Sequence, residues 1–294
     1  MSRLAGLICA LVVGFSFPMS MPVSAERGGG RPLFGPAEGD ALHVMSFNLR
    51  FAAERGPHSW PLRRPVMAEL LRREEPTVIG TQEGLHDQLT DLAHDLPPHY
   101  DWIGEGRGGG TRDEYVAIFY DTRRLTALAS GNFWLSDTPA VAASRTWGNE
   151  TVRMATWVRF ADRRTGRAFV MVNTHFDNHS ENSRVRGAAL IRDRIAEFDV
   201  PVLLTGDFNA DAGSAAYDLL VGAGMSDSWF AAATRSPRYA TWHGYRALEP
   251  NGPRIDWLLT KGEVSVSAAG MNTFSRDGEF PSDHLPIQAL LTID

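Results

Sequence analysis

Six short polar motifs, each beside a hydrophobic run, hold the residues of this sequence that are best suited to chemistry. In chain order they are Ser46-Phe47-Asn48, Gly80-Thr81-Gln82-Glu83, Asn173-Thr174-His175-Phe176-Asp177, Thr205-Gly206-Asp207-Phe208-Asn209, Arg254-Ile255-Asp256-Trp257 and Ser282-Asp283-His284. Carboxylate and amide oxygens are hard ligands that suit Mg²⁺, Mn²⁺ or Ca²⁺, whereas a structural zinc would need cysteine and clustered histidine. The set therefore predicts a divalent-metal site with histidines and carboxylates that could move protons.

Taken one at a time, these residues have ordinary structural explanations. Asn48 could be a turn residue, Glu83 a solvated loop acid, and Asp207-Phe208-Asn209 a turn that satisfies its own backbone. His175 could be a hydrogen-bonded interior histidine, and Asp283-His284 a helix cap with a chance neighbour. We favour the functional interpretation because an ordinary structural explanation would have to apply separately to each of the six motifs.

The elements that must position these motifs alternate between strand-like and helix-like patterns. Strands are predicted at 42–47, 78–82, 115–120, 153–160, 168–174, 200–205, 254–259 and 287–292, and helices at 61–71, 88–96 and 185–198. Short strand-and-helix stretches flank the β-rich segments. This order predicts two sheets packed face to face with helices outside, and active sites in such proteins gather at strand ends.

Composition narrows the class of protein. The chain has 294 residues with 43% hydrophobic residues and a formal net charge of −6, which excludes disordered, collagen-like and coiled-coil classes. No second linker follows Leu42, so residues 41–294 are predicted to form one large domain. The acidic balance argues against a sequence-blind nucleic-acid binder, but not against an enzyme that meets phosphate through a bound cation.

The N-terminal residues have the pattern of an export signal. Arg3 precedes an apolar run from Leu4 to Phe17, and Val23-Ser24-Ala25 is a small-residue cleavage site. Residues 1–25 are therefore predicted to be a signal peptide, which places the mature protein outside the cell or in the periplasm without stable membrane insertion. Residues 26–40 are predicted to be a flexible lead-in. Cys9 is the single cysteine, so the mature protein would contain no disulfide.

In this order, the motifs resemble the signature of the endonuclease/exonuclease/phosphatase superfamily, which includes DNase I, apurinic endonucleases, neutral sphingomyelinases and inositol polyphosphate 5-phosphatases. The resemblance covers residues 41–294 and implies a four-layer α/β/β/α sandwich, an α/β fold with two packed mixed sheets and outer helices. Phe133-Trp134-Leu135-Ser136 and Thr146-Trp147-Gly148 also look like the secreted bacterial branch of the superfamily.

The resemblance implies a role for each motif residue. It places Glu83 on a divalent metal with Asn48 beside it, Mg²⁺ in the first instance with Mn²⁺ or Ca²⁺ as alternatives, and Asp283 could contact a second metal. Asp207 would orient or deprotonate the attacking water, and Asn209 would fix that water and a phosphate oxygen. His284, held by Asp256, would donate to a phosphate oxygen or act as general acid–base. His175 would stabilise the pentacovalent phosphate or protonate the leaving oxygen.

Substrate contacts are predicted less specifically. Of four candidate arginines, Arg145, Arg153, Arg184 and Arg186, the preferred pair is Arg184 and Arg186, with Asp177 beside them. Trp134, Trp147 and Trp242 could stack on a substrate ring or pack in the core. The glycine-rich run 104–110 is expected to be a mobile loop near the site. Relatives often have a histidine at the position of Asn178, for which His179 could substitute.

The predicted function is an exported, divalent-metal-dependent phosphoesterase that hydrolyses P–O bonds by in-line attack of water. A phosphodiester substrate is slightly favoured, either nucleic acid or a lipid or small molecule, although no basic stripe of the kind used for long duplexes is visible. The alternatives are a phosphomonoesterase for inositol or sugar phosphates and a non-catalytic secreted binding protein. The protein is expected to be a monomer.

Overall fold

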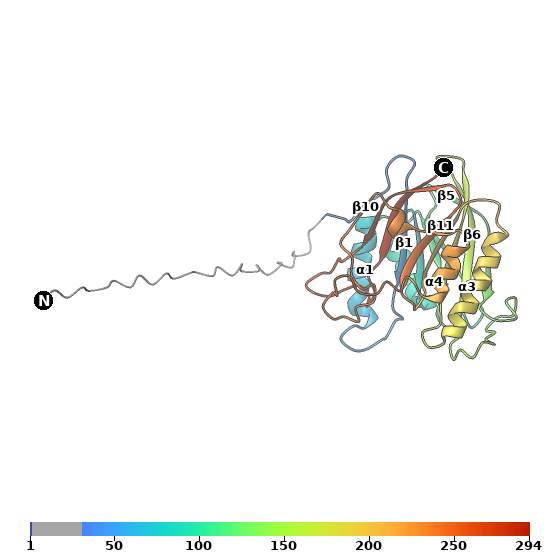
Figure 1. The fold of residues 1–294 in the computed structure, drawn as a ribbon, viewed down its shortest axis with the longest axis horizontal. Coiled ribbons are helices and arrows are strands. Elements are labelled where there is room, and N and C mark those ends of the chain that lie inside the picture. The colour runs from blue at the N-terminus through green and yellow to red at the C-terminus, as the bar shows by residue number, and fades with distance from the viewer. Residues whose placement is uncertain (2–30) are drawn as a thin grey trace.

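The computed structural model describes Met1 and residues 31–294, so the predicted signal peptide and the first residues of the lead-in lie outside the described part. Two mixed β sheets pack face to face, and helices cover both outer faces. Figure 1 shows α1 (Trp60–Glu74) on one side of this pair of sheets and α3 (Glu181–Ala196) and α4 (Ala215–Gly222) on the other. The predicted four-layer sandwich is confirmed.

The first sheet has seven strands in the order β10-β12-β13-β1-β2-β4-β3. Their bounds are β1 Leu42–Asn48, β2 Val78–Gln82, β3 Tyr100–Ile103, β4 Ile118–Asp121, β10 Thr234–Arg235, β12 Val264–Met271 and β13 Ile287–Ile293. β1 pairs with β2 in parallel and with β13 in antiparallel. The first and last strands of the domain are therefore neighbours at the centre of this sheet.

The second sheet has six strands in the order β5-β6-β7-β8-β11-β9. Their bounds are β5 Leu125–Trp134, β6 Met154–Asp162, β7 Ala168–His175, β8 Val202–Asp207, β9 Ser226–Asp227 and β11 Asp256–Lys261. β7 and β8 run parallel, whereas β11 runs antiparallel to β8. Two further helices, α2 His86–Asp95 and α5 Ser228–Ala231, complete the described elements.

Three hydrophobic layers hold the sandwich together. Val44, Val78 and Leu291 of the first sheet face Phe169 and Leu203 of the second in the central layer. On the outer faces, alternate residues of the same strands pack under the helices, as Met45 does with residues of α1 and Val172 with residues of α3. Strands buried on both faces read as nearly continuous apolar runs, which is why their positions are visible in the sequence.

The interface between the sheets also contains a polar contact. Gln82 Nε2 donates to Asn173 Oδ1 at 2.7 Å, and Asn173 Nδ2 donates to the carbonyl of Thr81. The sheets approach closely at Gly80, because a Cβ at this position would stand 2.2 Å from Thr205 Oγ1. The sheets therefore meet in one fixed arrangement just below the ends of β2 and β7.

The described part of the predicted lead-in is not free of the domain. The buried carboxylate of Glu74, at the end of α1, accepts hydrogen bonds from the N–H groups of Leu33, Phe34 and Gly35. His43 Nδ1 lies 2.8 Å from the carbonyl oxygen of Gly35. From Leu33 onward this segment is thus packed against the first sheet, in contrast to the flexible segment that its glycine and proline content suggests.

Within the described residues, no helix has the length and apolar character needed to cross a membrane.

Candidate active site

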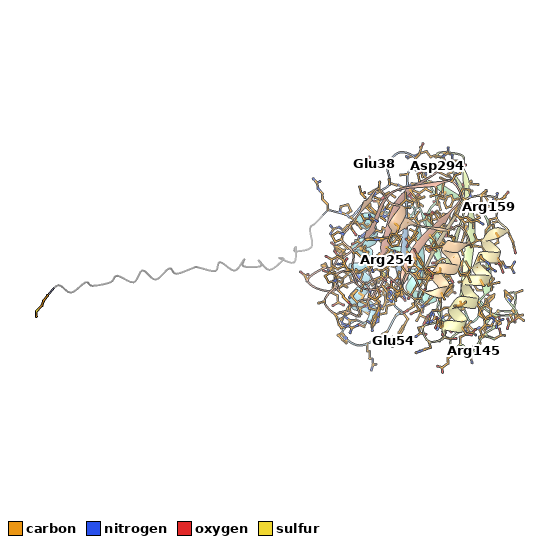
Figure 2. The ribbon with its side chains drawn as sticks, in the orientation of Figure 1. Glu38, Glu54, Arg145, Arg159, Arg254 and Asp294 are labelled. Carbon is orange, nitrogen blue, oxygen red and sulfur yellow. The ribbon has the colours of Figure 1, made fainter. Side chains whose placement is uncertain are left out.

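The predicted site residues meet at one edge of the two sheets. Asn48 ends β1 and lies opposite Gln82, the residue before Glu83. In the second sheet His175 lies opposite Asp207, and Asp207 lies opposite Asp256 at the start of the antiparallel β11. Glu54 and Arg145, labelled in Figure 2, come from loops at this edge, and Glu38 and Asp294 mark the opposite edge. Strand direction alone therefore gathers residues that are far apart in the sequence.

Asp207 is the centre of the group. Its Oδ2 accepts a hydrogen bond from Asn48 Nδ2 at 2.9 Å and lies 3.5 Å from His175 Nε2 and 3.7 Å from His284 Nε2. Its Oδ1 accepts the backbone N–H of Asn209 at 3.0 Å. Burial, together with the nearby Asp256 carboxylate, raises the pKa of Asp207 above its ordinary value. A carboxylate with a raised pKa is a better proton acceptor than a solvated aspartate.

His284 is held by Asp256. Its Nδ1 lies 3.0 Å from Asp256 Oδ2, which directs Nε2 toward Asp207. Burial by itself would lower the pKa of His284, but the carboxylates of Asp256 and Asp207 outweigh it and raise this pKa to about 10. The imidazole is thus positioned as a cation and hydrogen-bond donor, as in other carboxylate–histidine pairs.

His175 has the opposite character. Burial, followed by the charges of Arg153 and Arg107, lowers the pKa of His175 well below its ordinary value. Asn209 Nδ2 lies 3.1 Å from His175 Nε2 and also donates to the carbonyl of Phe176. A neutral His175 beside a cationic His284 gives the two histidines different roles at the same pH.

Backbone conformation also marks this edge. Glu83 and Asn209 have φ values of 63° and 49°, in the left-handed region that residues other than glycine rarely adopt. The same turn that gives Asn209 its positive φ brings its backbone N–H onto Asp207. Positive φ also occurs away from this edge, as at Glu75 with a φ of 39°, so at Glu83 and Asn209 it describes how the side chains are aimed and is not by itself a mark of function.

The donor set fits a hard divalent cation. Glu83, His175 and Asp207 each offer a ligand atom within 4.8 Å of the others, and so do Asp207, Asp256 and His284. Asn48 Nδ2 bridges the two sheets by donating to both Glu83 Oε1 and Asp207 Oδ2 at 2.9 Å. The buried Asp207 carboxylate and the partly buried Glu83 carboxylate share a single neutral amide, which favours binding of a cation. Glu83 and Asp207 are the residues placed to hold it.

The other two predicted metal ligands, Asn48 and Asp283, do not direct a side-chain oxygen to the cluster in the way that Glu83 does. Asn48 turns its amide nitrogen toward the carboxylates, and its Oδ1 accepts the N–H of Arg50 at 2.8 Å. Asp283 belongs to neither ligand cluster found among the described residues. Its backbone carbonyl instead accepts the N–H of His243 at 2.9 Å. The metal-binding roles of Asn48 and Asp283 stay predictions.

The three predicted substrate residues do not converge on Asp207. Arg186 pairs with Asp137 at 2.7 Å and stacks over Trp147, away from the catalytic cluster. Arg184 donates to the backbone carbonyl of Asp177 at 2.9 Å. The buried Asp177 carboxylate accepts the N–H groups of His179 and Ser180, so it shapes the turn before α3.

The arginine beside His175 is Arg153, a weaker candidate on sequence than Arg184 and Arg186. Arg153 is only 5% exposed; its Nη2 donates to Asn178 Oδ1 at 3.3 Å, and its Nε lies 3.9 Å from Asp177 Oδ2 but has no hydrogen-bond partner among the described residues. It lines a small, partly open pocket with Arg107, Glu114 and His175. The sequence signal that could have identified it is its place one residue before β6, the neighbour of the strand that ends at His175.

Arg107 comes from the glycine-rich loop and Glu114 from the residues that follow it. Arg107 Nη1 pairs with Glu114 Oε2 at 2.8 Å. Burial raises the pKa of Glu114 to about 7 in spite of this arginine. Backbone hydrogen bonds from Gly106 to Gly110 and from Gly108 to Arg112 close the loop on itself. The loop therefore presents a charged side chain to the site, although the sequence gives no phosphate-binding motif there.

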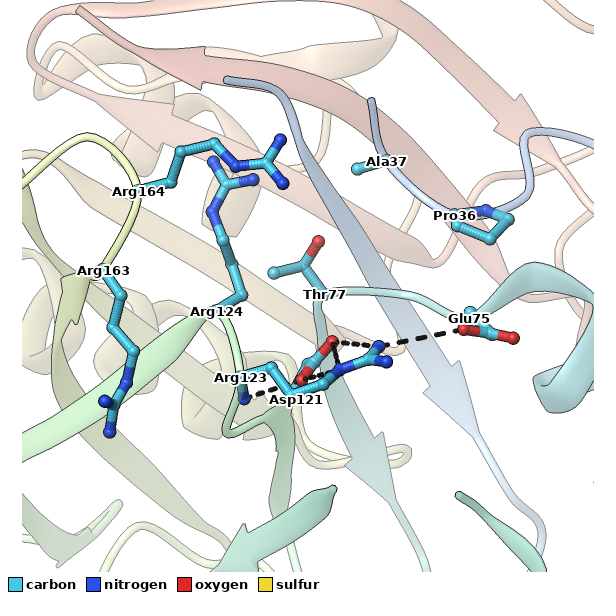
Figure 3. A pocket seen from close by; sticks show the side chains of 9 residues that line it. All are labelled: Pro36, Ala37, Glu75, Thr77, Asp121, Arg123, Arg124, Arg163 and Arg164. Atoms are coloured by element: carbon cyan, nitrogen blue, oxygen red, sulfur yellow. Dashed lines mark hydrogen bonds and ion pairs between the residues drawn. The ribbon is translucent and has the colours of Figure 1, made fainter. Parts of the chain in front are cut away.

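Two larger hollows lie on the surface. One, of about 530 Å³, is lined by Glu54 and Trp60 and by His86, Asp87 and other residues of α2. The other, of about 520 Å³, is lined by Arg123, Arg124, Arg163 and Arg164 (Figure 3). It also contains Thr77, which precedes β2, so it lies at the edge opposite to Glu83. The arginine-lined hollow is therefore separate from the catalytic residues.

Comparison with known proteins agrees with this geometry. The sequence pattern of the Endonuclease/Exonuclease/phosphatase family matches residues 45–284, from β1 to His284. The chain belongs to the endonuclease/exonuclease/phosphatase family. Among solved structures, it is 32% identical to the mannosyl-6-phosphatase of Bacteroides thetaiotaomicron, covering 85% of this chain and 99% of that one with a TM-score of 0.80.

More distant matches include one solved structure with the same fold and one protein matched by sequence. The human Nocturnin catalytic domain is 17% identical with a TM-score of 0.68, covering 87% of this chain and 95% of that chain. Protein angel of Drosophila melanogaster is 28% identical over 182 residues, which are 56% of this chain and 49% of that protein. The match thus spans about half the length of protein angel, whereas it spans nearly the whole of the solved structures.

Proposed function

We propose that this member of the endonuclease/exonuclease/phosphatase family is a metal-dependent phosphomonoesterase whose substrates are sugar phosphates. The observation that carries the proposal is the buried Arg153 beside His175. A monoester phosphate is a dianion near neutral pH, whereas a diester phosphate carries one negative charge. A cationic side chain in addition to the metal therefore stabilises a bound monoester more than a bound diester.

The relative that supports the same substrate class is the mannosyl-6-phosphatase, whose identity of 32% extends over almost its entire chain. The proposal selects the alternative that the sequence analysis ranked second to a phosphodiesterase. It also takes the mature protein to be exported, as the N-terminal sequence suggests, and the secreted bacterial branch to be its place in the family.

Different residues of the site carry out different steps of the reaction. Asp207, fixed by hydrogen bonds from Asn48 Nδ2 and the N–H of Asn209, accepts a proton from the attacking water, and Asn209 holds that water and a phosphoryl oxygen. The hydroxide oxygen forms a bond to phosphorus as the bond to the sugar oxygen breaks, and the products are the free sugar and inorganic phosphate. His284 supplies the proton that the leaving oxygen takes up; its raised pKa keeps the imidazole protonated, and its hydrogen bond to Asp256 orients it.

The remaining residues bind and orient the phosphoryl group. Arg153 donates to its peripheral oxygens, and Glu83 with Asp207 holds the divalent cation. When bound, that cation neutralises charge that develops on the phosphoryl oxygens. His175, kept neutral by burial, orients Asn209 through the contact at 3.1 Å.

The test is a metal-supplemented assay of the purified mature protein. We expect release of inorganic phosphate from hexose 6-phosphates, loss of that activity with EDTA and its recovery with Mg²⁺. The phosphodiester substrates assayed in parallel are bis-p-nitrophenyl phosphate, DNA, RNA and sphingomyelin. Faster turnover of any diester than of every hexose phosphate would contradict the monoester assignment. Absence of activity on all phosphate esters would point to a binding protein instead.

A further inference from the structure

Trp242 is a large aromatic residue on the surface next to the catalytic histidine. Its indole is 46% exposed, whereas the other tryptophans named in the sequence analysis, Trp134 and Trp147, are buried. The backbone of Trp242 forms an antiparallel bridge with His284. Residues opposite each other in such a bridge direct their side chains to the same face, with Cβ atoms about 5 Å apart. Because His284 faces Asp207, the indole of Trp242 stands beside the mouth of the site.

The segment that carries Trp242 is fixed to both catalytic segments through its backbone. The N–H of Leu285 donates to the carbonyl of Thr241 at 2.7 Å. Thr241 Oγ1 in turn accepts the N–H of Asp256 at 3.2 Å. None of these bonds uses the indole, so the position of the segment does not depend on the Trp242 side chain. A rigidly held aromatic ring can bind a ligand without a large loss of conformational entropy.

Two neighbours define the surroundings of the indole. The guanidinium of Arg246 lies 5.0 Å from the ring centroid of Trp242, as a cation–π contact. Gly244 has a φ of 56°, and a Cβ there would stand 3.1 Å from the ring. The glycine therefore leaves room for the indole, and Arg246 covers one face of the ring, so that a ligand would stack on the opposite face and meet the guanidinium at the ring edge.

We propose that Trp242 is the stacking platform for the sugar ring of the substrate and that Arg246 donates to its hydroxyl groups. The inference rests on the proposed phosphomonoesterase function. A pyranose has an apolar face of C–H groups and a rim of hydroxyl groups, which match an indole face and a guanidinium. The ring is joined to the phosphoryl group that His284 contacts, so it falls within reach of Trp242. An acyclic alcohol presents no such face.

The experiment compares ring-containing and acyclic substrates in Trp242→Ala, Trp242→Phe and Arg246→Ala. We expect Trp242→Ala to raise KM for mannose 6-phosphate about tenfold, the typical value of one aromatic contact, with kcat nearly unchanged. KM for glycerol 3-phosphate should stay within twofold. Trp242→Phe should restore part of the affinity, and Arg246→Ala should raise KM for the hexose phosphate alone. Adenosine 5′-monophosphate tests whether Trp242 prefers a nucleobase ring to the ring of a hexose.

The matched control is Phe230→Ala. Phe230 is 59% exposed and has the guanidinium of Arg254 over its ring, but it lies on α5 and not beside His284. Equal KM changes for mannose 6-phosphate and glycerol 3-phosphate in Trp242→Ala would overturn the platform while leaving the phosphatase activity standing. A larger KM change for the nucleotide than for the hexose phosphate would overturn the assignment to sugars.

If the wild type hydrolyses no monoester, the proposed function fails, and the platform is judged by binding alone. Isothermal titration of mannose 6-phosphate into Asp256→Asn, with and without the additional Trp242→Ala change, gives that answer. A weaker dissociation constant in the double variant supports the platform, and an unchanged constant overturns it.

Discussion

The side chains of Gln82 and Asn173 form a hydrogen bond across the interface between the two sheets, with 2.7 Å between Gln82 Nε2 and Asn173 Oδ1. Gln82 is the residue before Glu83, and Asn173 is two residues before His175. The two residues are fully buried. The bond therefore sets the spacing between the half of the site carried by the first sheet and the half carried by the second.

We expect Asn173→Ala to lower the free energy of unfolding by roughly 2–4 kcal/mol, because Gln82 and the carbonyls of Thr81 and Ala117 lose a buried partner. kcat should fall as well, since the halves of the site lose their fixed spacing. Urea denaturation and steady-state assays measure the two effects. Asn182→Ala, which removes one hydrogen bond to the carbonyl of Trp147, is the control and should change neither quantity by much.

The pair of Asp256 and His284 predicts a separate loss of kcat. In Asp256→Asn the imidazole loses its anionic partner at Nδ1, so we expect kcat to fall by about 10²-fold or more while KM changes little. Circular dichroism should show an intact fold. Asp199→Asn, at an exposed ion pair with Arg159, should keep wild-type kcat. A kcat within a factor of three of wild type in Asp256→Asn would contradict the role given to His284.

Arg153 should matter more for monoesters than for diesters. Arg153→Lys keeps a positive charge but loses the planar fork that binds two phosphoryl oxygens, and we expect kcat/KM for hexose 6-phosphates to fall about 10- to 100-fold. The loss for bis-p-nitrophenyl phosphate should be smaller. Arg186→Lys is the matched control, because Arg186 is half exposed and pairs with Asp137. Equal losses of kcat/KM for both substrates would contradict the inference that Arg153 favours a monoester substrate.

Metal binding can be measured without turnover. A cation held by Glu83 and Asp207 binds only the folded protein, so Mg²⁺ at a hundred times its dissociation constant should stabilise the fold by about 2.7 kcal/mol. Thermal unfolding of EDTA-treated protein with added Mg²⁺ gives the shift in Tm. We expect Glu83→Gln to abolish the shift and the surface variant Glu54→Gln to keep it. An equal shift in Glu83→Gln would place the cation elsewhere.

His43 predicts how stability depends on pH. Burial lowers the pKa of His43 below its ordinary value of 6.5, so the unfolded chain binds a proton more readily than the folded protein. The contribution of His43 to stability is thus present above pH 6.5 and declines as the pH falls below it. Urea denaturation between pH 5 and pH 8 should show a shallower decline in His43→Gln than in the wild type. The exposed His94→Gln should retain the wild-type slope.

Much of the fold could be predicted because strands buried on both faces leave long apolar runs. From these runs the ends of β1, β2, β7 and β8 are predicted to within two residues of those observed. The polar motifs at the ends of these strands predict the residues of the candidate site. β12 has a bulge between Val266 and Ala268 and exposed residues along one face, so its pattern is weak. β3 and β10, with four and two residues, are too short for a periodicity to show.

The substrate side of the site was harder to predict than the catalytic side. The position of Arg186 one turn along a helix after the His175 motif suggested a substrate contact, but its direction depends on how α3 packs on the second sheet. Arg153 looked like any arginine before a strand, and only the pairing of β6 with β7 brings it beside His175. Such tertiary contacts leave no periodic signal in the sequence.

The position of β13 between β12 and β1 has a consequence for the order in which the protein folds. β1, which carries Asn48, lacks one of its two partners until residues 287–293 have left the ribosome. Pairing of strands so far apart in sequence is slow, and an unpaired β1 is an edge that other chains could join. The site is therefore expected to assemble last, when the final strand inserts. Deletion of the last seven residues should abolish activity and favour aggregation, although it removes none of the catalytic side chains.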